Sequence, residues 1–265
     1  MSGHTKHTLL LRLAGPLQSW GTSSRYTERD TGLEPSKSGV VGILAASLGR
    51  TRDMPLDDLA VLRMGVRVDQ EGVPGYDFQT AGAGDDDPGI AMARDDDRVI
   101  ARRREELRLG TLKESARGKS SISNRHFLQD AIFLVGLEGD NLDFLHYLDT
   151  ALRNPVFPIG LGRRSYVPSV PVAIPDGGVR EGIALEDALQ GEPWSVGLAS
   201  RLSISRARRE LTRRLVIEAD GVDANATRID QPIGAAFQTR VFGPRQVRFG
   251  RCPVEIPQED SHARV

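Results

Sequence analysis

A stretch in the middle of the chain, residues 70–125, constrains the fold more than any other feature because apolar residues are sparse in it. It carries an acidic run and then a basic run. Residues 85–97 hold six Asp and one Arg, and residues 101–125 hold eight Lys/Arg and three Glu. Such a segment cannot form a packed core of its own. We therefore expect a long insertion that projects from the body as a hairpin, with a mobile acidic tip near 83–98.

The segments that flank this insertion alternate between strand and helix periodicity. In residues 8–14 the side chains of Leu9, Leu11 and Leu13 share one face, as in a strand with an apolar side. In chain order the pattern predicts a strand at 8–14, a helix at 37–48 between the cap Ser36 and the stop Gly49, a strand at 62–69, a buried strand at 131–137 and a helix at 141–153. This order is close to the split β-α-β of ferredoxin-like domains, in which both helices pack on one face of the sheet and the other face stays available.

The C-terminal third shows only short strand signals. They lie at 171–174, 197–205, 213–218, 238–242 and 246–249. We expect one domain over residues 1–250 and a disordered tail over 251–265.

Composition narrows the class of protein. The chain has 265 residues, a net charge of −1, 39% hydrophobic residues and 27% charged residues, as in a soluble globular protein. Cys252 is the only cysteine, so neither an intramolecular disulfide nor a cysteine-based zinc cluster can form. No run approaches the roughly 20 apolar residues of a membrane span, and the start lacks the core of a signal peptide. We expect a cytoplasmic protein without a metal or other cofactor.

The segment Gly160-Leu161-Gly162-Arg163-Arg164-Ser165 is the strongest local indication of function. Its two glycines permit a tight turn and a close approach to a ligand. Its two arginines and its serine offer donors that suit phosphate. A solvated surface loop is the alternative, and on local grounds it is the commoner outcome.

Two further motifs have a structural and a functional interpretation. GLEPSKS (32–38) lacks the second glycine of a nucleotide-binding P-loop, which argues against ATP or GTP binding. The helix start with Lys37 and Ser38 could still bind an anion, or it could be a plain cap. Trp20, close to Gln18, could stack on a base or plug the edge of the core, and the local pattern favours the core.

The remaining candidates concern catalysis and a basic track. His126 is a lone histidine without a visible catalytic partner, and neither a Ser-His-Asp pattern nor paired metal-binding carboxylates appear, so we do not expect an enzyme. Residues 201–214 hold six Arg and one Glu, which suits either a nucleic-acid track or a salt-bridged surface. The aromatic signature of RRM sheets is absent, so RNA would not bind by the usual stacking on a sheet.

Five motifs together carry a resemblance to a known family. They are GPLQSWG (15–21), EPSKSGVVGILAASLG (34–49), ISNRHFLQDAIFLVGL (122–137), FPIGLGRRSYVP (157–168) and VFGPRQVRF (241–249). Their order and spacing resemble the "Cas-five" (CasD) subunits of type I-E CRISPR Cascade complexes, over roughly residues 8–250. The acidic run at 85–97 and the segment 175–235 depart from the family pattern.

The resemblance implies a fold and a function. The fold would be a ferredoxin-like (RRM-like, RAMP) core with a long β-hairpin thumb at about 76–128 and additional short C-terminal strands. The protein would not cut RNA. It would cap the 5′ handle of the CRISPR RNA and join the backbone subunit CasC to the large subunit CasA, with target DNA nearby and a separate nuclease recruited later.

Two alternatives stay open beside this function. One is a metal-independent endoribonuclease that processes CRISPR precursor RNA, with His126 acting together with Lys119 or Tyr166. The other is a clamp on target DNA made by the arginines of 201–214. For the leading hypothesis the expected RNA-binding residues are Gln18, Trp20, Arg25, Lys37, Ser38, Arg117, Lys119, Arg125, His126, Gly160, Gly162, Arg163, Arg164, Ser165 and Tyr166.

Overall fold

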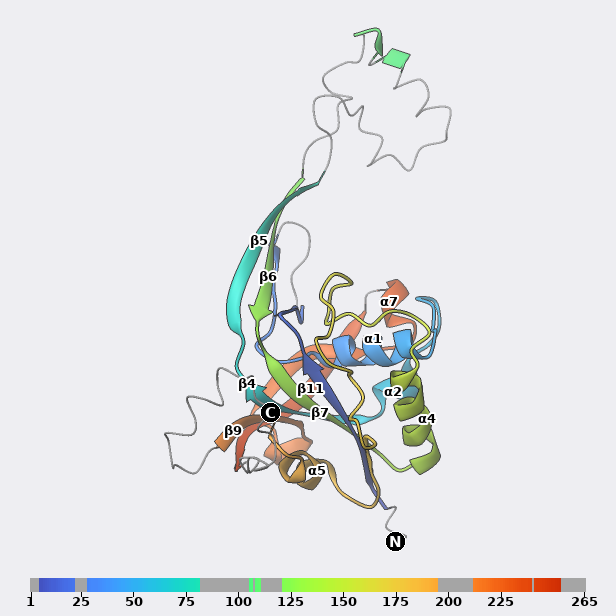
Figure 1. The fold of residues 1–265 in the computed structure, drawn as a ribbon, viewed down its shortest axis with the longest axis vertical. Helices are drawn as coiled ribbons and strands as arrows, with labels where there is room; N and C mark the ends of the chain where they lie inside the picture. The colour runs from blue at the N-terminus through green and yellow to red at the C-terminus, as the bar shows by residue number, and fades with distance from the viewer. Residues whose placement is uncertain are drawn as a thin grey trace, which may run out of the picture. The chain divides into compact units, whose positions relative to one another are not determined.

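The computed structural model describes residues 5–21, 28–81, 105–106, 108–110, 121–194, 212–239 and 241–253. The chain divides into two compact units. The first contains Met1–Ser23, Asp30–Gly75 and Phe127–Val265, and the second contains Ser24–Arg29 and Tyr76–His126. Helices and antiparallel strands both contribute to the first unit (Figure 1), so the expected α+β class is confirmed.

Three strands form the centre of the first unit: β1 (His7–Ala14), β7 (Ile132–Gly139) and β4 (Arg63–Gln70). β7 lies between the other two and is antiparallel to both. The sheet continues on both sides of these three strands. On the side of β1 it ends with the short edge strand β8 (Val179–Arg180), and on the side of β4 it continues with β9 (Thr212–Glu218), β11 (Phe242–Pro253) and β10 (Ala226–Pro232), so that its order is β10-β11-β9-β4-β7-β1-β8. The three strands predicted around the insertion are thus neighbours in one sheet.

Two helices cover one face of this sheet, as the sequence predicts. They are α1 (Lys37–Ser47) and α4 (Leu142–Arg153), and they pack with Leu9, Leu11 and Leu13 in the main core. The Ser36 hydroxyl accepts from the Gly39 amide at 3.3 Å, and Gly49 follows the helix with φ of +74°. The Asn141 side chain likewise accepts from the Phe144 amide at 3.0 Å. Local capping therefore sets where both helices begin.

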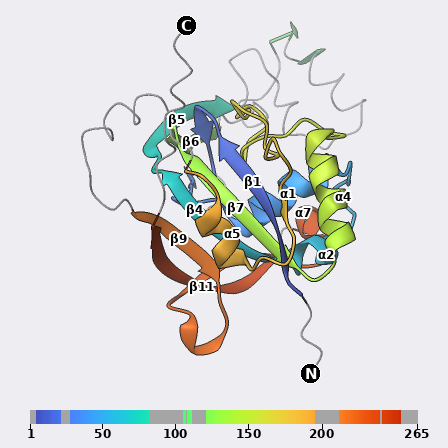
Figure 2. The same cartoon turned by 60° about the horizontal axis from the view of Figure 1, so that its bottom comes forward.

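The second face of the sheet is covered as well, contrary to our expectation of an available face. The short helix α5 (Leu185–Gly191) lies on it, opposite α1 (Figure 2), and forms a second core with Leu10 and Leu134. Gly65 and Gly136 are cross-strand partners, and a Cβ on Gly136 would lie 2.6 Å from the Leu185 side chain. Because these two glycines have no side chains, α5 can pack directly against β4 and β7.

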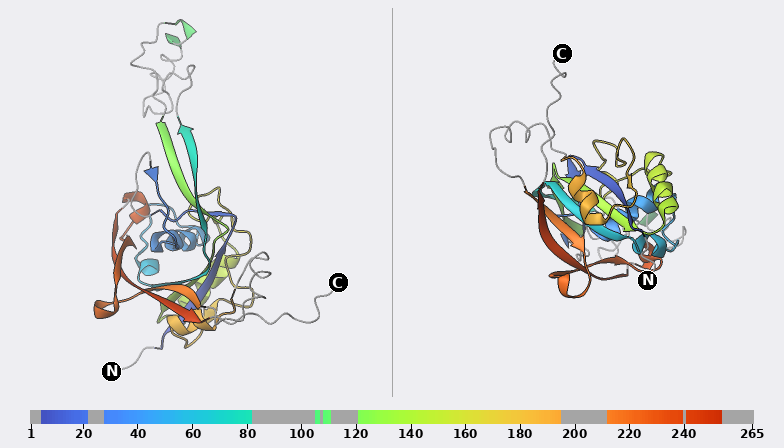
Figure 3. Two further views of the ribbon diagram at one scale, coloured as in Figure 1. Left: turned by 90° about the vertical axis from the view of Figure 1, so that its left-hand side faces the viewer. Right: turned by 90° about the horizontal axis from the view of Figure 1, so that it is seen from below.

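Three C-terminal strands extend the sheet beyond β4, in orange and red in Figure 3. They are β9 (Thr212–Glu218), β10 (Ala226–Pro232) and β11 (Phe242–Pro253). The strand predicted at 238–242 is wrong, because Ala236–Thr239 forms the helix α7 and β11 begins only at Phe242. The disordered tail predicted for 251–265 begins too early in the sequence. Cys252 is buried, and it lies opposite Arg213 where β11 pairs with β9. The segment predicted at 171–174 makes only a single bridge, between Leu11 and Ala173.

The shorter elements complete the first unit. They are β2 (Leu17–Gln18), α2 (Asp57–Ala60) and the 3-10 helix η3 (Gly221–Asp223). The predicted strand at 197–205 and the tail from residue 254 onward lie outside the described residues.

A two-stranded ribbon runs from the first unit into the second. It consists of β5 (Val73–Ala81) and β6 (Ser121–Gln129), which are paired and lie side by side in Figure 1. In the second unit β3 (Glu28–Arg29) pairs in parallel with β6. The predicted insertion thus begins and ends with paired strands, while its acidic tip near 83–98 lies outside the described residues.

Candidate nucleic-acid interface

The Gly-Arg-Arg segment is a closed loop with a buried root, between α4 and β8 (yellow in Figure 1). Leu161 is fully buried in the main core, and its amide donates to the Tyr166 carbonyl at 2.7 Å. Tyr166 in turn donates its amide to the Arg163 carbonyl at 3.0 Å. These two bonds close a short turn, which leaves Arg164 and Ser165 at its tip.

This loop is fastened to the loop that follows β1. The Ser19 amide donates to the Leu161 carbonyl at 3.0 Å. Gly162 has φ of +87°, and a Cβ at this position would lie 1.6 Å from the Ser19 carbonyl oxygen. Only glycine fits this close contact of two backbones. The motifs GPLQSWG (15–21) and GLGRRS (160–165) therefore form one structural unit, although Ser19 and Gly162 are 143 positions apart in the sequence.

The two arginines of the loop differ in their surroundings. Arg163 is partly buried, and its Nη1 donates to the Tyr166 hydroxyl at 2.8 Å while its guanidinium lies 5.3 Å from the centre of the Tyr166 ring. Arg164 and Ser165 are exposed, and neither side chain forms a hydrogen bond or an ion pair within the described part of the chain. The tip thus presents one guanidinium and one hydroxyl to solvent.

Trp20 and Gln18 are structural, which corrects their expected contact with RNA. Trp20 is 1% exposed and Gln18 is fully buried. The Trp20 indole donates to the Gln18 side chain at 3.2 Å, and Gln18 donates to the Ala131 carbonyl at 2.7 Å. The indole also lies against Gly39 in the first turn of α1. The tryptophan that could stack on a base instead joins the loop after β1 to the start of α1.

Lys37 is also buried, so the anion site expected at the start of α1 is already occupied from within the protein. The Lys37 amide donates to the Asp230 carboxylate at 2.8 Å, and its side chain pairs with Glu218 at 2.8 Å. Burial lowers the pKa of Lys37, while the Glu218 carboxylate opposes this shift. Ser38 is partly buried, and its hydroxyl donates to the Ser36 hydroxyl at 3.3 Å. This site therefore offers no cation to RNA in this conformation.

A wider set of charges joins the EPSKSG segment to the C-terminal strands. Glu34 pairs with both Arg214 and Arg228, and Arg245 pairs with Asp230 at 2.8 Å. Arg214 and Arg228 lie 180 and 194 residues from Glu34 in the sequence. No local spacing could therefore have indicated these ion pairs.

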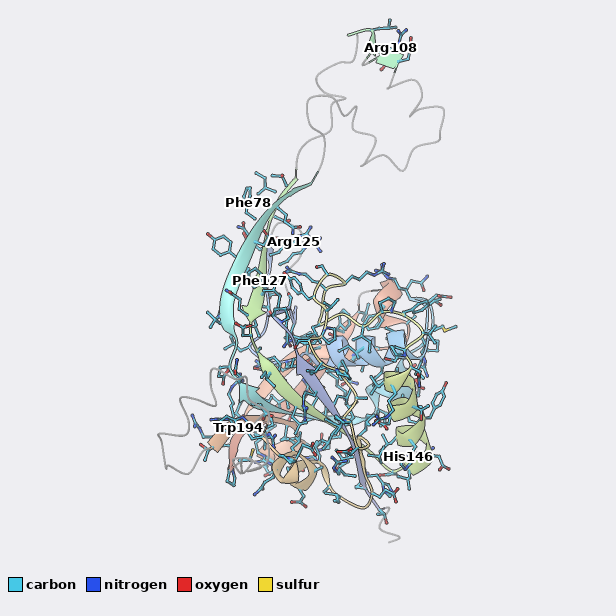
Figure 4. All side chains as sticks on the ribbon, in the orientation of Figure 1. Phe78, Arg108, Arg125, Phe127, His146 and Trp194 are labelled. Atoms are coloured by element: carbon cyan, nitrogen blue, oxygen red, sulfur yellow. The ribbon has the colours of Figure 1, made fainter. Side chains whose placement is uncertain are left out.

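The arginine run at 201–214 is described only at its end. Arg213, near the start of β9, lies over the ring of Trp194 at 3.8 Å. Trp194 is labelled in Figure 4. Arg214 pairs with Glu34 and Glu71. Arg214 is thus salt-bridged within the protein, whereas Arg213 stacks on an aromatic ring. Arg201, Arg206, Arg208 and Arg209 lie outside the described residues.

The second unit holds the remaining candidates, Arg125 and His126. Arg125 donates to the Ser123 hydroxyl at 3.3 Å, and His126 lies 3.5 Å from the Glu28 carboxylate. Tyr76, 6.0 Å from the His126 ring, is 67% exposed, and Phe78 is 59% exposed. Phe78 and Arg125 both belong to the ribbon (Figure 4). Arg25, Arg117 and Lys119 lie outside the described residues.

The described residues contain neither a metal-binding cluster nor a membrane-spanning helix. Among them no three His, Cys, Asp or Glu side chains gather as a metal ion would require. None of the helices in the described ranges is both long enough and apolar enough to cross a membrane.

Known proteins share both the sequence pattern and the fold. A family model described as "CRISPR-associated protein (Cas_Cas5)" matches residues 8–248. The Escherichia coli (strain K12) protein "CRISPR system Cascade subunit CasD" is 51% identical over 45 residues, 17% of this chain and 20% of that relative. The matched stretch therefore spans a fifth of the curated relative's length.

Two solved structures resemble most of the chain. The chain named "Crystal structure of Cas protein" is 40% identical, with a TM-score of 0.66 and coverage of 95% of this chain and 98% of that one. A chain of a "CRISPR RNA-guided surveillance complex" is 28% identical, with a TM-score of 0.63 and coverage of 93% and 90%.

Proposed function

Because the chain belongs to the CRISPR-associated Cas5 family, we propose that it is a non-catalytic subunit of a Cascade-type CRISPR RNA-guided surveillance complex in the cytoplasm. The similarity to the Cascade subunit CasD and to a chain of a surveillance complex supports this assembly. In it, the protein holds the 5′ handle of the CRISPR RNA. It also joins the backbone subunit CasC to the large subunit CasA, close to target DNA.

We also propose that the first unit contains a ferredoxin-like (RAMP) core. The strands β1, β4, β7 and β8 correspond to the first, second, third and fourth strands of a ferredoxin-like (RAMP) core, and α1 and α4 are its helices. The sheet order β4-β7-β1-β8 and its antiparallel pairs support this assignment. The ribbon of β5 and β6 is the proposed thumb, which wedges the RNA strand and displaces one nucleotide.

One observation carries the RNA-binding role: the exposed tip of the Gly-Arg-Arg loop on a buried root. The closed turn fixes the backbone that carries this guanidinium and this hydroxyl, so binding does not have to order the backbone as well. Both groups donate to phosphate oxygens, and a bond from arginine to phosphate is charge-assisted. RNA that is recognised by sequence is commonly single-stranded, as a handle would be.

Replacing both arginines in the assembled complex tests the role. Arg163→Ala/Arg164→Ala should weaken the binding of CRISPR RNA, since each charge-assisted bond contributes about 1.5–3 kcal/mol. Filter binding at low and high salt measures the loss. Unchanged affinity and unchanged assembly at both salt concentrations would show that the loop does not hold the handle.

The alternative of an endoribonuclease has its own test. His126 faces the Glu28 carboxylate, and the Tyr166 hydroxyl accepts from Arg163, so both candidate groups in the described residues have a partner. We expect purified protein to leave labelled repeat RNA intact in the presence of EDTA. A single cut that His126→Ala abolishes would make the protein a nuclease.

A further inference from the structure

We propose that the two arginines of the loop have different tasks: Arg164 contacts an RNA phosphate, and Arg163 is a positioning residue that fixes the turn through Tyr166. This inference rests on the proposed RNA-binding function and specifies how its site works. It follows from the different contacts of two neighbouring side chains of the same type.

Arg163 is bound to Tyr166 through both its side chain and its backbone. Its Nη1 donates to the tyrosine hydroxyl at 2.8 Å, and its guanidinium lies within 5.3 Å of the ring centre. Its carbonyl accepts from the Tyr166 amide at 3.0 Å. A guanidinium with these contacts has to give some of them up before it can turn its fork fully to a phosphate.

Tyr166 is a suitable anchor because it is itself fixed. It is 9% exposed, its carbonyl accepts from the Leu161 amide at 2.7 Å, and its ring meets the Phe127 ring edge-on at 6.3 Å. Phe127 stands at the root of the ribbon, where a Cβ on Gly75 would lie 2.6 Å from its ring. Arg163 is thus connected to the core through the tyrosine.

Arg164 has none of these constraints. Its side chain is exposed beside the exposed Ser165, and in the described part of the chain it has no carboxylate or carbonyl partner. An unpaired arginine next to a hydroxyl can bind a phosphate without first breaking an intramolecular bond. The contact with RNA therefore belongs to Arg164 and Ser165.

The salt dependence of binding separates the two tasks. Each phosphate contact to a single strand adds about 0.7 to the slope of log affinity against log salt concentration, whereas a positioning residue adds nothing to it. The probe is the full-length protein with single-stranded RNA that carries the repeat-derived handle, measured between about 50 and 200 mM salt.

We expect Arg164→Ala to weaken binding about tenfold to a hundredfold and to make the slope about 0.7 shallower. Arg163→Ala and Tyr166→Phe should each weaken binding without changing the slope. Their double variant should be no weaker than Arg163→Ala alone, because both remove the same contact. The phenylalanine keeps the buried ring, so the fold is preserved. Arg52→Ala, at an exposed arginine outside the loop, is the matched control.

Two other outcomes are distinguishable. If Arg163→Ala reduces the slope as much as Arg164→Ala while Tyr166→Phe has no effect, both arginines contact phosphate and the division of tasks is wrong, although the loop still binds RNA. If Arg164→Ala and Ser165→Ala leave affinity and slope unchanged, the proposed function of the loop fails as well.

Discussion

At the scale of single residues, Gly162 lies where two loops meet, and the contact leaves no room for a side chain. Its φ of +87° alone would strain any other residue, and the Ser19 carbonyl oxygen lies where a Cβ would be. Because Gly162 directly precedes the two arginines in this turn, its conformation sets the path of the backbone that carries Arg164.

We expect Gly162→Ala to destabilise the protein by about 1–2 kcal/mol from backbone strain and by about 1–3 kcal/mol more from the clash. It should also weaken RNA binding. Gly177→Ala is the matched control, because Gly177 has φ of +100° but nothing within 4 Å of its Cβ position. Thermal unfolding of both variants measures the difference. Equal losses would mean that the two loops do not depend on their close contact.

Lys37 shows how a basic residue in a promising motif can be structural. It is 1% exposed and pairs with Glu218, so its charge is used within the protein. The sequence EPSKSG indicates a helix start correctly, but it cannot show that Asp230 and Glu218 arrive from the C-terminal strands.

Lys37→Met should lower the free energy of unfolding by about 3 kcal/mol, because it leaves the Glu218 carboxylate without its main partner. The salt slope of RNA binding should stay the same. Lys6→Met is the control, since Lys6 pairs with Asp140 on the surface and should cost no more than about 0.5 kcal/mol. A shallower salt slope for Lys37→Met would restore the lysine as an RNA contact.

At the scale of elements, α5 decides which surface of the sheet is available. It packs Leu185 and Leu189 over Gly65 and Gly136 and closes the face that RRM-like domains use for bases. Under the proposed function, RNA would therefore contact loops and edges of the first unit, such as the loop that carries Arg164, and not this face of the sheet.

Gly136→Val should displace α5 and destabilise the protein by about 1–3 kcal/mol, because a Cβ there lies 2.6 Å from Leu185. Gly191→Ala, at the end of the same helix with open space around its Cβ position, should be neutral or slightly stabilising. Chemical denaturation compares the two. An unchanged free energy of unfolding for Gly136→Val would mean that other contacts hold α5 in place.

Long periodic elements could be predicted from the sequence and short ones could not. The alternation in residues 8–14 and the helix at 141–153 follow from local periodicity and capping, and both are confirmed. The seven residues of α5 are too few for a clear period, and α7 stands where a strand was predicted because tertiary contacts override weak propensity. The Gly-Arg-Arg loop could be proposed as a site from its residue types. The burial of Trp20 and Lys37 could not be predicted, because it depends on contacts with residues distant in sequence.

At the scale of the whole molecule, the proposed function places this chain at the 5′ end of a CRISPR RNA. Family membership, together with a rigid loop that exposes Arg164 and Ser165, supports this place. The central claim is that the tip of this loop touches the handle in the assembled complex.

Site-specific photocrosslinking tests this claim most directly. A benzophenone amino acid at Ser165 should crosslink to the 5′ handle of the CRISPR RNA in the assembled complex. The same amino acid at Val222, which is fully exposed on η3, serves as the control and should not. A crosslink from Ser165 only to protein, or to RNA outside the handle, would contradict the account.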